Sequence, residues 1–106
     1  MKNELLEEIL RLPGFDWNEG NREKNKKHEV EKIEIEELFF NPPFVILPDI
    51  KHSVNEVRYH CFGKTFNRRR LLIVFTIRNG KIRPISARAM NEKERNYYEE
   101  KTKTNS

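Results

Sequence analysis

The sequence lacks several features on which small proteins often depend. Cysteine occurs once, at Cys61, which excludes an intrachain disulfide and a cysteine-based zinc site and suits a reducing compartment. Neither a glycine-rich phosphate loop nor an HExxH metal motif is present, and no carboxylates show two-metal spacing. The longest apolar run, residues 71–77, contains Thr76 and is too short to cross a bilayer. We therefore expect no metal, no cofactor and no membrane association.

A secretory leader and a hydrolase triad are also not expected. Acidic residues follow Met1 where a signal peptide would be basic and then apolar, so we expect a cytoplasmic protein. Asp49, His52 and Ser53 are the residue types of a hydrolase triad, but they share one loop, whereas triad members normally converge from separated segments. We expect them to make local turn hydrogen bonds instead.

Charge is abundant and unevenly distributed along the chain. The 106 residues suit one domain, and charged and hydrophobic residues each make up 36%, with seven Phe, three Tyr and one Trp. Residues 1–40 hold seven Lys/Arg and eleven Asp/Glu, a balance of −4, whereas residues 41–106 hold fourteen and six, a balance of +8. The second part therefore suits an anionic partner, although ordinary surface charge would give the same asymmetry.

The hydrophobic pattern predicts two terminal helices around a run of strands. A helix over 3–12 ends at Pro13-Gly14, a short strand is possible at 15–17, and any helix over 19–28 would be exposed. Residues 31–40 fit a helix, but their alternation also permits a strand, and Asn41-Pro42-Pro43 stops either one. Asn91 and Glu94 form a capping box for a helix over 92–101. Strands are predicted at 44–47, 56–62, 70–77 and 81–87.

The last two strands should form a hairpin around a two-residue type I′ turn at Asn79-Gly80. This turn pairs Thr76 with Arg83, and continued pairing opposes Val74 to Ile85, Ile73 to Ser86 and Leu72 to Ala87. Pro84 predicts an edge position or a nearby bulge. One face becomes apolar, so we expect an α+β fold with an antiparallel β-sheet and helices packed on one face. The apolar face holds Leu71, Ile73, Phe75, Ile77, Ile82 and Pro84.

A basic α+β domain without metal ligands can cleave RNA with the RNA's own 2′-hydroxyl as the nucleophile. This reaction needs a base, an acid and cations near the phosphate. Arginine suits the last role because its planar fork meets two phosphate oxygens, although a solvated surface arginine is the commoner case. Arg83 is favoured because Thr76 lies opposite. The arginine candidates are Arg58, Arg70, Arg83 and Arg88.

Histidine and aromatic candidates complete the predicted site. His28 can exchange a proton near neutral pH, or can interact with the end of a helix. His52 is expected to order its loop, and His60, opposite in strand parity to its neighbours, receives no role. Trp17 can stack on a base or belong to the core. Of Tyr97 and Tyr98, one should pack and the other can reach RNA.

These residues occur in an order that resembles the BrnT family of toxins, over about residues 15–100. The matching segments are Phe15-Asp16-Trp17, Asn25, Lys27-His28-Glu29-Val30, Phe39, Asp49, His52-Ser53, Glu56, Arg58, Gly63, Arg70 to Thr76, Arg83 to Arg88, Glu94-Arg95 and Tyr97-Tyr98. Glu29 stands where the family often has glycine. Residues 1–14 lie outside the usual match, so we expect a helical extension at 1–14, a toxin domain at 15–101 and a disordered tail at 102–106.

The resemblance implies a RelE-like microbial ribonuclease fold, RNA cleavage that blocks translation, and a DNA-binding BrnA antitoxin. It places the important positions at Trp17, His28, Thr76, Arg83 and Arg88. We therefore expect His28, Thr76, Arg83 and Arg88 to be catalytic. A dimeric ribbon-helix-helix antitoxin would bind the operator DNA and form a heterotetramer with two toxin chains. The alternative is a non-catalytic module that binds nucleic acid or an antitoxin, namely a degenerate toxin acting as a corepressor. The expected RNA-binding residues are Trp17, Lys27, Arg58, Arg70 and Tyr97.

Overall fold

Three helices and a four-stranded sheet make up the described part of the chain. The computed structural model describes residues 4–11, 13–17 and 29–103. Its elements are α1 (Glu4–Arg11), α3 (Lys32–Phe39), β1 (Val45–Pro48), the 3₁₀ helix η1 (Ile50–His52), β2 (Arg58–Lys64), β3 (Arg70–Arg78), β4 (Lys81–Ala89) and α4 (Glu92–Thr102). The predicted α+β class with an antiparallel sheet is confirmed, and so is each predicted strand, to within two residues at every end.

The sheet has the strand order β1-β2-β3-β4, and every neighbouring pair is antiparallel. The β3–β4 hairpin turns at Asn79 and Gly80, whose φ angles of 54° and 71° are both positive, as a type I′ turn requires. Phe15 forms an isolated bridge to Ile82, so the predicted short strand at 15–17 is present as one bridge beside β4.

The predicted hairpin register is correct near the turn and wrong beyond it. Thr76 faces Arg83 and Phe75 faces Pro84, but Val74 faces Ser86 in place of the predicted Ile85. A bulge between Val74 and Phe75 inserts one extra β4 residue, so Ile73 then pairs with Ala87 and Leu72 with Arg88. The bulge lies beside Pro84, where the missing backbone donor predicted one.

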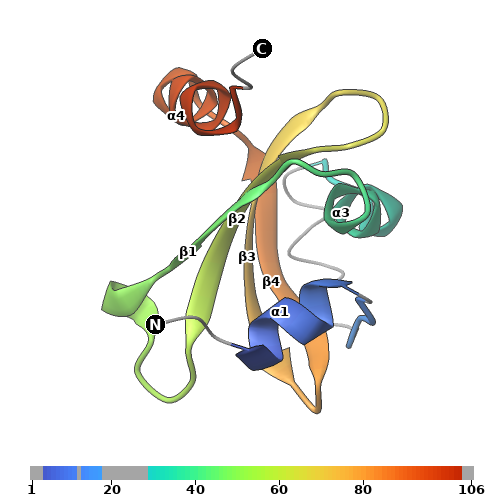
Figure 1. The fold of residues 1–106 in the computed structure, drawn as a ribbon, viewed down its shortest axis with the longest axis vertical. Coiled ribbons are helices and arrows are strands. Elements are labelled where there is room, and N and C mark those ends of the chain that lie inside the picture. Colours follow the sequence, from blue (N-terminus) through green and yellow to red (C-terminus); the bar gives the residue numbers. More distant parts are fainter. Residues whose placement is uncertain (1–3, 12, 18–28, 104–106) are drawn as a thin grey trace.

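One face of the sheet carries the main core, which α1 and α3 cover (Figure 1). Ile35 and Leu38 of α3 are fully buried, and Ile9 of α1 joins the same cluster. Residues 32–39 form a helix because Glu31 and Glu34 make a capping box and because helical spacing directs Ile35, Leu38 and Phe39 to the sheet. Gly63 lets α3 approach β2 closely, since a Cβ there would lie 2.7 Å from Leu38 Cγ.

The third helix, α4, packs against the opposite face of the sheet (Figure 1), so helices cover both faces, whereas the sequence predicted helices packed on one face. Tyr98 is fully buried in a second cluster with Phe62, Leu72 and Met90. Phe62 and Leu72 alternate along their strands with residues of the main core, and Met90 follows β4 directly. The Tyr98 hydroxyl also donates to the Pro43 carbonyl at 2.6 Å. Asn91 and Glu94 form the predicted capping box. In Figure 1, α4 covers one end of this face, and the β3–β4 hairpin lies at the other end.

Parts of two predicted segments lie outside the described residues. They are residues 19–28, where any helix would be an exposed one, and residues 104–106 of the expected tail. Residues 4–11 form α1, whose Leu6, Ile9 and Leu10 pack on the main core, so this part of the predicted extension contacts the toxin domain directly.

Candidate functional site: a basic sheet face

The half of the sheet face that α4 leaves open carries two of the arginines predicted from the sequence, Arg58 and Arg83. Side chains alternate between the two faces of a strand, so the residues between those of the main core point to this side. We call this surface the basic face. Its residues are Arg58 and His60 from β2, Thr76 and Arg78 from β3, and Lys81 and Arg83 from β4.

A row of three residues crosses the basic face at one level. Arg58 is the register partner of Thr76 on one side, and Arg83 is its partner on the other. Thr76 is 1% exposed, and its hydroxyl donates to the Val57 carbonyl at 2.7 Å. The hydroxyl therefore joins β3 to the segment just before β2, and the two arginines flank it. The structure thus brings together three of the residues predicted from the sequence.

The arginines of the basic face differ in their partners. Arg83 Nη1 lies 3.4 Å from Asp16 Oδ2, and Arg78 Nη2 lies 3.1 Å from Glu56 Oε2. For Arg58, the described residues provide no carboxylate within ion-pair distance of the guanidinium. Arg58 is therefore the cation of this row with no competing protein anion among the described residues.

Two histidines share one carboxylate at the β1 side of the basic face. His52 Nδ1 lies 2.8 Å and His60 Nε2 lies 3.0 Å from the same atom, Asp49 Oδ2. Burial acts to raise the pKa of Asp49, but hydrogen bonds from His52 and His60, together with their charges, outweigh it and lower that pKa. The predicted local turn bonds are also present, because Asp49 Oδ1 accepts from the His52 amide and Ser53 Oγ donates to the Asp49 carbonyl.

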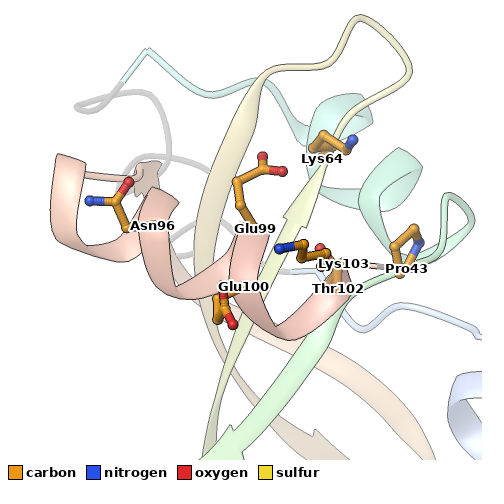
Figure 2. Close-up of a pocket in the computed structure, with 7 residues that line it drawn as sticks. All are labelled: Pro43, Lys64, Asn96, Glu99, Glu100, Thr102 and Lys103. Carbon is orange, nitrogen blue, oxygen red and sulfur yellow. The ribbon is translucent and has the colours of Figure 1, made fainter. Parts of the chain in front are cut away.

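One hollow on the described surface adjoins the basic face. This hollow has a volume of about 290 Å³ and lies at the loop before β2. A larger one, about 770 Å³, lies beside the end of α4, and Figure 2 shows Lys64 and Glu99 among its lining residues. None of the residues predicted for the site lines the larger hollow. The smaller one is lined by Lys51, His52, Val54, Asn55, Glu56 and Arg58.

Two predicted site residues, Arg88 and Arg70, lie at the α4 end of the same face and are paired with that helix. Arg88 makes two contacts to the Glu94 carboxylate, at 2.7 and 2.8 Å. These hydrogen bonds raise the pKa of Arg88 and lower that of Glu94, each against the effect of burial. Arg70 Nε lies 2.8 Å from Glu99. Both arginines therefore fasten α4 to the sheet.

The two predicted aromatic residues lie in different places. Tyr97 is half-buried on α4 with its ring 5.3 Å from that of Phe62, and its neighbour Tyr98 is the packed residue of the pair. Trp17 packs on the α3 side of the sheet, where its indole N–H donates to Glu36 at 2.8 Å and Lys32 lies over its ring. Trp17 is therefore separated from the row of Arg58, Thr76 and Arg83.

Lys27 and His28 lie outside the described residues, so their predicted roles stay predictions. The sequence analysis assigned no role to His60, and the structure places this residue on the basic face. The available signal was parity, because His60 is two residues from Arg58 on one strand and so shares its face. Within residues 4–11, 13–17 and 29–103, no group of three His, Cys, Asp or Glu side chains is placed to hold a metal ion. Among these same residues no helix is long and apolar enough to span a membrane.

The fold is an antiparallel sheet with arginines and titratable side chains together on one open face. Such a face is suited to bind phosphate groups. The family model of the ribonuclease toxin BrnT, of type II toxin–antitoxin systems, matches residues 17–94. The chain therefore belongs to the BrnT family of ribonuclease toxins, as its sequence resemblance indicated. A search of individually curated proteins finds no match. The family match covers β1 to β4 and the first turn of α4, so it includes the whole basic face.

Proposed function

We propose that this toxin is a metal-independent endoribonuclease that binds single-stranded RNA on the basic face and cleaves it with the RNA's own 2′-hydroxyl. The observation that carries the proposal is the row of Arg58, Thr76 and Arg83, which sets two guanidinium groups on either side of a buried hydroxyl. Such a row supplies fixed positive charge without a metal ion. The family identity supports RNA as the substrate.

The spacing of Arg58 and Arg83 suits the binding of one phosphate group in the transition state of cleavage. Neighbouring strands lie about 4.8 Å apart, so the Cα atoms of Arg58 and Arg83 are separated by roughly 10 Å across β3. Long side chains on both sides can close on one phosphate from this distance. Planar guanidinium forks meet two oxygens at once and stay charged at every physiological pH, so they stabilise the charge that develops during cleavage.

The ion pair between Arg83 and Asp16 leaves Arg83 available to RNA. Its closest approach is 3.4 Å, and the two side chains are 22% and 26% exposed. Partly exposed pairs of this length contribute little to stability, so a phosphate can replace the carboxylate as the partner of Arg83. Asp16 then acts as a placeholder that holds the guanidinium over the sheet.

The α4 end of the face extends the proposed RNA surface. The side chains of Arg70 and Arg88 are 41% and 42% exposed, so phosphate oxygens can reach them while their ion pairs with α4 persist. Tyr97 offers the exposed part of its ring beside them. Lys27 and His28 are proposed to add a cation and a proton-transfer group. Trp17 packs on the other side of the sheet, and the proposed surface does not use it.

We propose that a BrnA-like ribbon-helix-helix antitoxin silences the toxin by covering the basic face in the cytoplasm. Acidic side chains of the antitoxin would be captured quickly by complementary charge. An apolar side chain of the antitoxin could pack beside the basic face against Ile50, Val54 and Val57, which are 83, 85 and 51% exposed. Operator DNA is then bound through the antitoxin alone, and a dimeric antitoxin makes the assembly a heterotetramer.

Cleavage by the purified toxin in EDTA tests the proposed chemistry. We expect single-stranded RNA to be cut at the same rate with EDTA and with added magnesium, because the charge comes from arginine. Complete dependence on a divalent ion would refute the mechanism.

Co-expression with the neighbouring gene tests the proposed partner. It should yield one complex on size exclusion and restore growth. A neighbouring protein that neither co-purifies nor relieves toxicity would refute the antitoxin assignment.

A further inference from the structure

The cluster of Asp49, His52 and His60 has no part in the mechanism above, which names only His28 for proton transfer. Cleavage by a 2′-hydroxyl needs two such groups. The bond from O2′ to phosphorus forms while a base takes the 2′ proton, and the bond from phosphorus to O5′ breaks while an acid gives O5′ a proton. The products are a 2′,3′-cyclic phosphate and a 5′-hydroxyl. A second proton-transfer group is therefore required.

Asp49 is held in a fixed position beside the basic face. Its backbone amide donates to the Arg58 carbonyl at 2.7 Å, and its own carbonyl accepts from Ser53 Oγ at 2.6 Å. The side chain of Asp49 is only 11% exposed, and its lowered pKa keeps it ionised at neutral pH. An ionised carboxylate only accepts hydrogen bonds. His60 must therefore direct an Nε2–H at Asp49, which leaves its Nδ1 to exchange a proton.

His60 is the ring of the pair that belongs to the basic face. It lies on β2, two residues from Arg58, and its side chain is 33% exposed. His52 reaches the same carboxylate oxygen from η1, outside the sheet, and is 60% exposed. The strand fixes the position of His60, whereas a loop carries His52. His60 is thus placed to act on a phosphate that Arg58 holds.

We propose that His60 is the general acid of RNA cleavage, donating a proton from Nδ1 to the departing O5′, and that Asp49 is its positioning residue. This inference rests on the proposed function. When the ring carries both protons, its charge is matched by Asp49 at 3.0 Å and by Glu94 of α4, whose charge interacts with it. The positive charges of Arg58, on the same strand, and of Arg88, the partner of Glu94, act against the protonated form of His60. His52 is the other titratable group on Asp49.

A sulfur atom in place of the leaving O5′ tests the assignment, because a thiolate departs without needing a proton. The experiment measures single-turnover cleavage in EDTA at the linkage that the wild-type toxin cuts first, with either oxygen or sulfur at that position. We expect His60→Gln to cut the oxygen substrate about 10²- to 10⁴-fold more slowly than wild type. With the sulfur substrate, most of this loss should disappear, and RNA binding should stay unchanged.

Two further variants define the role of each partner. Asp49→Asn keeps the hydrogen-bonding shape and the cap of η1, so we expect a smaller loss on the oxygen substrate that sulfur again restores. A structural defect would slow both substrates alike. His52→Gln removes the other ring from the same oxygen, and we expect a smaller loss than for His60→Gln. Thermal unfolding of each variant checks that the sheet stays folded.

The outcomes separate this inference from the proposed function. His60→Gln that cuts the oxygen substrate at the wild-type rate would overturn the inference alone. Equal losses on oxygen and sulfur substrates would also overturn it, because His60 would then support the face without donating a proton. A wild-type toxin that cuts neither substrate would refute the proposed function, and this inference with it.

Discussion

Replacing Arg83 with alanine is the mutation with the clearest expected effect. Arg83 faces Thr76 across the hairpin and forms one side of the proposed phosphate site. Loss of one group that stabilises developing charge typically slows a reaction about 10²- to 10³-fold. We therefore expect Arg83→Ala to abolish growth arrest on induction and to reduce RNA cleavage in EDTA by that factor. Arg83→Lys should rescue poorly, because it keeps the charge but loses the fork.

The fold should survive this substitution. The only ion pair that Arg83 makes among the described residues is the 3.4 Å contact with Asp16, and pairs of this kind contribute about 1 kcal/mol or less. Asp16 keeps access to water after the change, since its side chain is 26% exposed. Thermal unfolding should therefore be nearly unchanged, which distinguishes lost chemistry from lost structure.

Arg11→Ala is the matched control, because it removes the same charge from the exposed end of α1, on the other side of the sheet. Its toxicity should equal that of the wild type. An Arg83→Ala protein that is folded and still arrests growth would refute the phosphate-site assignment. If Arg11→Ala lost as much activity, overall charge rather than the row on the basic face would explain the effect.

Four further predictions concern the packing and the buried groups. Gly63→Ala should destabilise the protein by about 1–3 kcal/mol in chemical denaturation, because its Cβ would lie 2.7 Å from Leu38 Cγ. Tyr98→Phe should cost about 1 kcal/mol through the lost hydrogen bond to Pro43. Folding lowers the pKa of Glu94, so its ionised carboxylate stabilises the folded protein at pH values above the unfolded pKa of about 4.3. This stabilisation is lost as the pH falls through the folded pKa. Glu94→Gln should therefore make the free energy of unfolding depend less on pH in this acid range. Cys61 is fully buried, which raises the pKa of its thiol, so a thiol reagent should modify it at the rate of unfolding; fast native-state modification would contradict the structure.

Turn chemistry made the hairpin and its core face predictable. Asn79-Gly80 fixes a two-residue turn, and the register from that turn places Thr76 opposite Arg83 and buries Phe75. Pro84 predicted an edge position or a nearby bulge, but not the point at which the register shifts, because that point depends on how both strands meet the rest of the sheet. The prediction therefore fails from Val74 onward.

Long-range packing was less visible in the sequence. The helix α4 is mostly polar and buries one full side chain, Tyr98, so its pattern does not indicate which face it covers. The contact between Asp49 and His60 depends on the β1–β2 pairing and on the loop between these strands, so no local sequence motif predicts it. The pairing of Arg88 with Glu94 likewise exists only because α4 folds back onto β4.

The chemistry of the RNA ends tests the central claim most directly. The purified toxin is incubated with a short single-stranded RNA in EDTA, and the ends of the fragments are identified by mass spectrometry. Attack by the 2′-hydroxyl between Arg58 and Arg83 predicts a 2′,3′-cyclic phosphate on one fragment and a 5′-hydroxyl on the other. Fragments with a 3′-hydroxyl and a 5′-phosphate would mean that water is the nucleophile and would contradict the account.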